Sequence, residues 1–123
     1  MESKAAKVLA DPQIQLTLLG DAVFSAEVGF LVWDDDRHYV AANRRACELL
    51  GCTLEQLLGS VVGERTVEGE QAVARVIQGD GRSGRLTVER FDGRRITVEY
   101  LTFGTRSARL PYMASIIWAA DDE

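Results

Sequence analysis

The chain has 123 residues, of which 46% are apolar and 27% charged, and its formal net charge is −5. This length suits one domain with a real core and is too short for two. The acidic balance argues against nucleic-acid binding, because phosphate contact depends on clustered Lys and Arg. No apolar run approaches a membrane span and no signal-peptide pattern opens the chain, so we expect a cytoplasmic protein without a membrane partner.

Residues 1–20 are expected to form an N-terminal helical extension, frayed or loosely helical up to Asp11. Asp11 followed by Pro12 is a typical helix start, an N-cap acid before a residue that needs no free N–H. The helix is expected to reach Leu19 and to break at Gly20. Its apolar stripe includes Ile14 and Leu18. Two interpretations are open: the helix packs onto its own sheet, or it pairs two protomers.

Residues 29–51 read as strand, turn, strand, cap and helix. β-forming residues from Phe30 to Trp33 and from Tyr39 to Ala42 flank the acidic turn 34–37. Asn43 is a favoured N-cap, and Gly51 fits the left-handed position that ends a helix. The three consecutive aspartates of the turn point in different directions and have no further ligand at calcium-binding spacing, so no metal site is expected.

Local signals also organise the next segment. Thr53 and Gln56 form a capping-box pattern for a short helix that ends at Gly59. After a connector over 60–66, apolar spacing predicts a longer helix from Glu68 to Gln78. The glycine-rich loop 79–84 lies between a helix and a strand and lacks the Lys-Ser/Thr ending of a phosphate loop, so we interpret it as a flexible connector.

Three strands are predicted at the end of the chain, over residues 86–91, 94–103 and 112–119, before an acidic tail at 120–123. Asp92-Gly93 is a tight hairpin turn between the first two. Two strands, several helices and three strands give an α+β order. The paired glutamates Glu89 and Glu99 mark the wetter face of these strands, because successive side chains alternate between faces.

Alternation then divides the late strands into two sets. The inward set is expected to be Leu86, Val88, Val98, Tyr100, Thr102, Ala114, Ile116 and Trp118. The wetter set is expected to be Thr87, Glu89, Phe91, Thr97, Glu99, Leu101, Phe103, Met113, Ser115 and Ile117.

Several short motifs occur together in an order that resembles a PAS sensor domain over residues 20–119. They are Asp34, Ala42-Asn43, the run ACELLG at 46–51, Leu57-Leu58-Gly59 and Asp92-Gly93-Arg94. The resemblance implies a PAS-like domain at 21–119, in which a five-stranded antiparallel sheet carries short helices on one face and Leu31 and Trp33 join the inward set. It also implies a ligand site on that inward face.

The pocket candidates on this basis are Leu31, Trp33, Cys47, Leu50, Val76, Val98, Tyr100, Ile116 and Trp118. Aromatic side chains bury about 150–250 Å² each, so two alternatives stand: an aromatic-filled core without a ligand, or a modest apolar or aromatic ligand stacked on the rings.

The cofactor of such a domain is unknown from the sequence. Flavin, haem and covalent chromophores are disfavoured, because segment 60–66 has no Cys for flavin chemistry and the single His, His38, begins the second strand instead of lying on the long helix. Cys47 and Cys52 come too early for hydroxycinnamoyl attachment. Their spacing is neither CxxC nor a metal-ligand pattern, so a structural role in a reducing compartment is expected.

The wetter face has an apolar centre too large to leave exposed on a monomer of this size. The dimer-interface candidates are Ile14, Leu18, Phe30, Val32, Leu101, Phe103, Met113 and Ile117. Because no nucleophile and base assemble on the inward face, no enzyme is expected. The sequence favours a sensory module that binds a small molecule and forms a homodimer, with a possible effector domain or partner protein. The alternative is a ligand-free interaction module.

Overall fold

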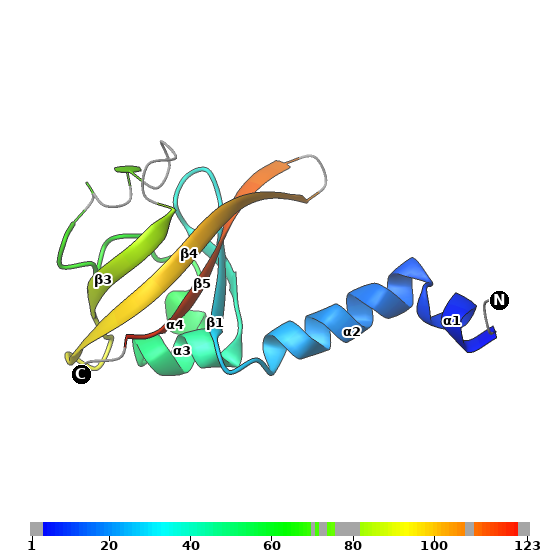
Figure 1. Ribbon diagram of the computed structural model, residues 1–123. Coiled ribbons are helices and arrows are strands. Elements are labelled where there is room, and N and C mark those ends of the chain that lie inside the picture. The colour runs from blue at the N-terminus through cyan, green and yellow to red at the C-terminus, as the bar shows by residue number, and fades with distance from the viewer. Residues whose placement is uncertain (1–3, 70, 72–73, 76–81, 108–109, 121–123) are drawn as a thin grey trace.

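The computed structural model describes residues 4–69, 71, 74–75, 82–107 and 110–120. Its helices are α1 (Lys4–Leu9), α2 (Pro12–Phe24), α3 (Arg44–Leu50) and α4 (Leu54–Leu57). Its strands are β1 (Gly29–Trp33), β2 (Tyr39–Ala42), β3 (Ser83–Glu89), β4 (Arg95–Ser107) and β5 (Leu110–Ala119). All strand pairs are antiparallel, in the order β2-β1-β5-β4-β3, with α3 and α4 beside the sheet (Figure 1). The α+β class and the five-stranded antiparallel sheet are confirmed.

Side-chain caps set the ends of the two short helices. Asn43 is the N-cap of α3, and Gly51 ends that helix in the left-handed conformation at φ 68°. A Cβ at Gly51 would lie 2.9 Å from the Arg90 Nε atom, so a larger residue would be strained by the positive φ and would displace the flexible end of Arg90. Thr53 and Gln56 form the predicted capping box of α4.

The β3–β4 hairpin is confirmed, with strand limits that differ from the prediction. Arg90 N donates to Arg94 O at 2.6 Å, and Gly93 has a φ of 88° in the turn. The strand β3 begins at Ser83 and ends at Glu89, so it includes part of the predicted loop. The predicted helix from Glu68 begins in a turn, and residues 70, 72–73 and 76–78 of it lie outside the described residues, as do residues 79–81 of the predicted loop.

The core lies between the sheet and the two short helices. Its buried apolar side chains are Leu31, Ala46, Leu49, Leu50, Leu57 and Ile117. Close contact of α3 with β1 requires a glycine, because a Cβ at Gly29 would lie 3.0 Å from the Ala46 Cα atom and 2.8 Å from Ile117. The face of the sheet that points to α3 and α4 is therefore the inner face.

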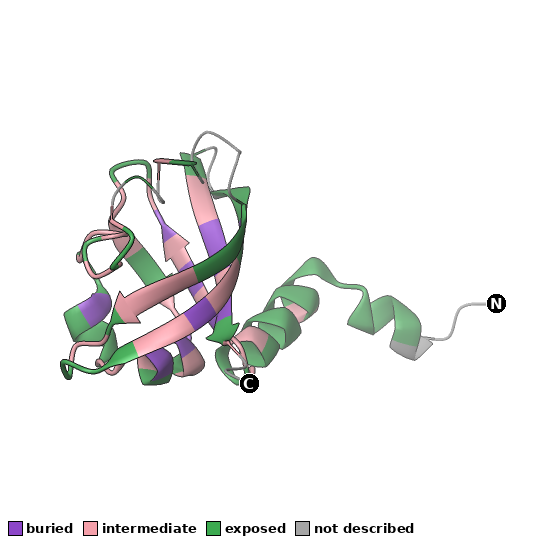
Figure 2. Ribbon diagram, turned by 60° about the vertical axis from the view of Figure 1, so that its left-hand side comes forward, coloured by how far each residue is buried: buried purple, intermediate pink, exposed green. Residues whose placement is uncertain are grey.

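The helix α2 differs from both the predicted end and one predicted role. It continues through Gly20 to Phe24, so the expected break at Gly20 is wrong. A single glycine costs a helix interior only about 1 kcal/mol. The helix extends away from the sheet and has no buried residue, so packing along its own sheet is not observed (Figures 1 and 2). None of the described helices is long and apolar enough to cross a membrane.

The two faces of β5 are the reverse of the prediction. Trp33 is paired with Met113, Leu31 with Ser115 and Tyr100 with Ile117, and directly opposed residues of antiparallel strands share a face. Met113 and Ile117 therefore lie on the inner face, and their expected place on the wetter face is wrong. Ala114, Ile116 and Trp118 lie on the other side, so their expected inward orientation is wrong too.

The reason is that β5, LPYMASIIWA, is apolar on both of its sides. A shift of one residue in a strand exchanges every side chain between faces, and alternation cannot detect it without a polar side. Phe91 is also misplaced by alternation, because β3 has ended at Glu89 and the chain is already turning. Its ring packs against the core cluster instead of lying on the wetter face.

Candidate functional site

A cavity of about 90 Å³ lies between the inner face, the short helices and the segment 60–66. Leu31, Trp33, Val98 and Tyr100 line it from the sheet, and Leu50 lines it from α3. All five are pocket candidates from the sequence. Apolar atoms with a few polar groups are the usual lining of a small-molecule site. The cavity is of the same order as the roughly 150 Å³ apolar cavity that holds a benzene ring.

Three other pocket candidates, Cys47, Ile116 and Trp118, do not line this cavity, and a fourth cannot be placed. Cys47 packs against the core cluster from α3 without reaching the cavity. Val76 lies outside the described residues. Ile116 and Trp118 lie across the sheet, and Trp118 is 36% exposed with its indole N–H donating to Glu99 Oε2 at 2.7 Å. These last two are therefore corrections to the predicted pocket.

A small buried polar network stands in the wall of the cavity. Trp33 Nε1 donates to Ser115 Oγ at 3.1 Å, and Ser115 Oγ lies 2.9 Å from Thr102 Oγ1. All three residues are buried. Because buried polar groups need partners, these bonds hold the Trp33 ring against the cavity and explain why Ser115, not Trp118, points inward.

Segment 60–66 forms the wall opposite the sheet, which the sequence indicated only as a connector. Its backbone is attached to the free edge of β3: Glu89 N donates to Arg65 O at 2.8 Å and Val67 N donates to Thr87 O at 2.8 Å. An isolated bridge joins Thr66 to Val88. These bonds fix the position of Arg65 in the lining. No local pattern in the sequence indicates this pairing, since it depends on an edge strand more than twenty residues away.

The Arg65 side chain is only partly satisfied. Its guanidinium stacks on the Phe91 ring, 3.8 Å from the centroid, and Nη1 donates to Arg90 O at 3.4 Å. Its Nε atom is shut off from solvent and has no hydrogen-bond partner. Of the five N–H donors of the guanidinium, one has a hydrogen-bond partner within the described residues.

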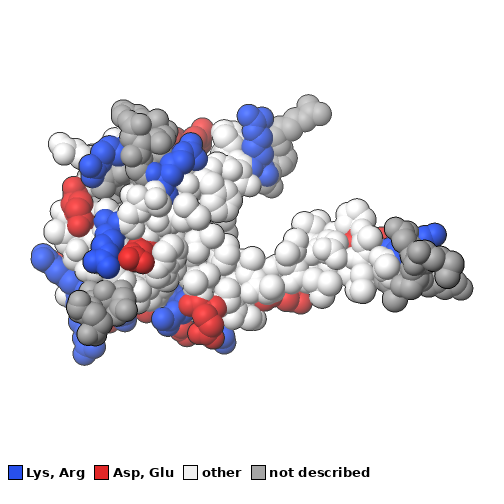
Figure 3. Space-filling model, in the orientation of Figure 1, with Lys and Arg blue, Asp and Glu red and all other residues white. Residues whose placement is uncertain are grey.

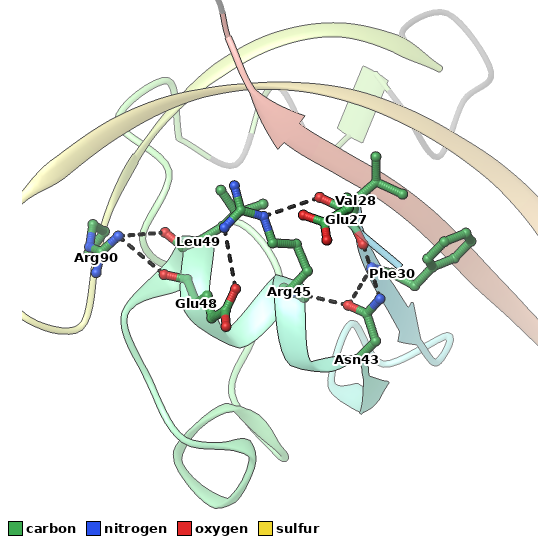
Figure 4. Close-up of polar contacts among 9 residues, drawn as sticks. Glu27, Val28, Phe30, Asn43, Arg45, Glu48, Leu49 and Arg90 are labelled. Carbon is green, nitrogen blue, oxygen red and sulfur yellow. Dashed lines mark hydrogen bonds and ion pairs between the residues drawn. The ribbon is translucent and has the colours of Figure 1, made fainter. Parts of the chain in front are cut away.

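Two other arginines donate to backbone carbonyls, as Figure 4 shows, and each also pairs with a carboxylate. Arg90 donates to the carbonyls of Glu48 and Leu49 at the end of α3, both at 3.2 Å, and pairs with Asp92 at 3.0 Å. Arg45 donates to Glu27 O and pairs with Glu48. Within the described residues, no ion pair joins Arg65 to a carboxylate.

Burial keeps one hydroxyl and two thiol groups of the core neutral at physiological pH. Burial raises the pKa of the Tyr39 hydroxyl to about 12. Burial, with the neighbouring Cys47 thiol, raises the pKa of Cys52 to about 11, and burial also raises the pKa of Cys47. The two thiols are free. Raised pKa values leave little thiolate at pH 7, so neither cysteine is primed as a nucleophile.

The acidic turn has a structural explanation. Asp34 Oδ1 accepts the backbone N–H groups of Asp36 and His38, at 3.0 and 2.8 Å, which closes the turn. The His38 Nδ1 atom is 3.9 Å from the same carboxylate oxygen. In the described part of the chain, no three His, Cys, Asp or Glu side chains are grouped to hold a metal ion.

The outer face is the side of the sheet away from α3 and α4. It is formed by Phe30, Val32, Leu101, Phe103, Ala114, Ile116 and Trp118. Leu101 and Phe103 are 44% and 42% exposed. The last turn of α2 borders this face in a groove lined by Val23, Phe24, Phe30 and Val32.

Apolar surface continues from the outer face onto α2. Leu16, Leu18 and Leu19 are exposed along the helix, while Ile14 is half-buried. The surface where the sheet meets α2 carries few charges (Figure 3). Of the dimer-interface candidates, Met113 and Ile117 do not belong to this surface, because they point inward.

A family model described as PAS fold matches residues 23–106. Similar solved structures include the PAS domain of a protein from Desulfitobacterium hafniense, with 22% identity, a TM-score of 0.73 and coverage of 81% of this chain and 99% of that one. The PAS domain of an HTR-like protein from Haloarcula marismortui has 19% identity and a TM-score of 0.74, with coverage of 88% and 99%.

A third structure is a domain of a sensory box sensor histidine kinase/response regulator from Geobacter sulfurreducens, with 20% identity, a TM-score of 0.71 and coverage of 89% and 97%. At these identities the likeness shows a shared fold. No curated protein matches the chain. Because the family model spans more than half of the residues, the chain belongs to the PAS fold family.

Proposed function

We propose that this PAS domain is a sensory module that binds a small apolar or aromatic molecule in the inner-face cavity. The cavity of about 90 Å³, lined by Trp33 and Tyr100, carries this proposal. The Geobacter sulfurreducens neighbour is named as part of a sensor histidine kinase/response regulator, which supports a signalling role. The neutral thiols and Tyr39, and the single His outside the lining, offer no nucleophile and base for catalysis.

The output surface in this proposal is the outer face together with α2, occupied by a second copy of the chain. The α2 leucines cover no part of their own sheet, and the outer face leaves Leu101 and Phe103 exposed. Two copies would bury both apolar surfaces at once in an isologous interface. A ligand that favours one packing of the sheet would then change how the copies pair.

One observation favours a second candidate, a ligand-free interaction module. Typical small-molecule pockets measure about 300–1,000 Å³, and this cavity is smaller. In an interaction module of this kind the cavity holds no ligand, and the outer face alone carries the function by binding a second copy of the chain. The two candidates share the dimer and differ in whether a molecule is retained.

Native mass spectrometry separates these candidates and tests the interface in one experiment. We expect the wild-type protein to be a dimer that carries a bound small molecule, released when the protein is denatured. Leu101→Glu places a charge in the centre of the outer face, so we expect it to shift the population to monomer while the fold and the retained molecule persist.

Leu58→Glu is the matched control, because Leu58 is 42% exposed and lies at the end of α4, away from the outer face. This variant should remain a dimer. A wild-type protein without a bound molecule supports the interaction module instead. A Leu101→Glu dimer as stable as the wild type rules out the outer face as the interface.

A further inference from the structure

The feature that carries a further inference is the positive charge of Arg65 in the cavity wall. Its partners are an aromatic ring and one backbone carbonyl, and its Nε–H is buried without an acceptor. Leaving a buried donor unsatisfied is unfavourable, more so on a charged group. Because Arg65 is in the lining, an anionic group placed in the cavity can interact with the charge of its guanidinium.

The position of this side chain is set by the fold. The Arg65 carbonyl is held by Glu89 N at 2.8 Å, and the stacking on Phe91 fixes the plane of the guanidinium. Arginine presents a rigid planar fork that matches a carboxylate in two parallel bonds. A pre-positioned fork loses little side-chain entropy on binding, which favours recognition over a purely structural role.

The other lining residues indicate the chemistry of the rest of the ligand, apart from its anionic group. The lining beside Arg65 is largely apolar and includes Leu57, Val62, Leu86 and Val88. The buried hydroxyls of Ser115 and Thr102 already bond to each other, and Trp33 Nε1 already donates to Ser115. An apolar or single-ring body fits these walls, with one anionic group directed at the wall that contains Arg65.

None of the described carboxylates of the protein forms an ion pair with Arg65. Glu64 also borders the cavity, but it is exposed and forms no ion pair with Arg65. Arg90 and Arg45 are paired with Asp92 and Glu48. Among the lining residues Arg65 is the basic one, and it has no carboxylate partner within the described residues.

Resting on the proposed function, we propose that the cavity selects a small monocarboxylate with an apolar or aromatic body, and that Arg65 binds its carboxylate. Phosphorylated or multiply charged ligands do not suit a wall with one available cation and an acidic neighbour. Neutral aromatics would occupy the same space with lower affinity.

The test compares two probes that differ in charge and little in shape, benzoate and benzamide, by ligand-observed NMR titration of the purified protein. We expect benzoate to bind the wild type at least about tenfold more tightly than benzamide, the range of one hydrogen-bonded charge. Arg65→Gln should remove this preference by weakening benzoate alone. Arg65→Lys, which keeps the charge without the fork, should retain part of it.

Arg95→Gln is the control, because Arg95 is exposed at the start of β4 and does not line the cavity. It should leave both affinities unchanged. Equal binding of benzoate and benzamide to the wild type overturns the inference while leaving a ligand-binding module in place. Binding of neither probe contradicts both. The wild-type comparison stands even if Arg65→Gln does not fold.

Discussion

Asn43→Ala is expected to lower the free energy of unfolding by about 3 kcal/mol or more, a large part of the roughly 5–15 kcal/mol that stabilises a domain. The Asn43 side chain is 3% exposed and makes four hydrogen bonds. Its Oδ1 accepts from Phe30 N at 2.9 Å and Ala46 N at 3.0 Å. Its Nδ2 donates to Val23 O at 2.6 Å and to Val28 O at 3.0 Å. Figure 4 shows Asn43 beside Val28 and Phe30.

These bonds join α2, β1 and α3 at one point, so the substitution leaves several buried backbone groups without partners. Urea unfolding monitored by circular dichroism measures the effect. Thr53→Ala is the matched control, since Thr53 is also an N-cap but is exposed and acts only within its own capping box. Its expected cost is about 1 kcal/mol. Equal losses for the two variants would contradict the role of Asn43 as a junction.

Trp33→Ala is expected to cost about 3–5 kcal/mol, the range for a fully buried aromatic side chain. Trp33 is 3% exposed and its indole is anchored by Ser115. In the monomer, Trp118→Ala is expected to cost only about 1 kcal/mol, because Trp118 is 36% exposed there and loses chiefly a surface hydrogen bond to Glu99.

The comparison, made with both variants in the monomeric Leu101→Glu background, tests the register of β5 directly. The chain has two tryptophans, so each variant retains one fluorescent reporter. The Trp118→Ala protein, which keeps Trp33, should emit at shorter wavelength and resist iodide quenching. A larger loss of stability for Trp118→Ala than for Trp33→Ala would mean that the faces of β5 are those expected from alternation.

The local features of the fold could be predicted because each depends on a few adjacent residues. Asn43, Gly51 and Thr53 satisfy backbone groups within their own helix ends, and the Asp92-Gly93 turn closes on its own neighbours. The groups that these residues satisfy lie within a few positions of them in the sequence, so the sequence alone predicts the helix ends and the turn. The sheet and its family then follow from the order of these signals.

The faces of β5 could not be predicted in the same way, because they are decided by pairing with β1 and β4. Ser115 was the available signal: a hydroxyl opposite Thr102 on the neighbouring strand satisfies both groups. Arg65 was missed for a related reason. Its place in the cavity wall depends on an edge pairing with β3 and on stacking over Phe91, which no local pattern indicates.

The central claim is that the inner face of the sheet binds a small molecule while the outer face pairs two copies. Ile116 and Ile117 are adjacent in β5, but Ile116 is on the outer face and Ile117 on the inner one. Their δ1-methyl groups therefore report the two faces separately in a methyl-labelled NMR sample. We expect benzoate addition to shift the Ile117 methyl signal first, and dilution to shift the Ile116 signal. A ligand response at Ile116 with none at Ile117 would contradict the account.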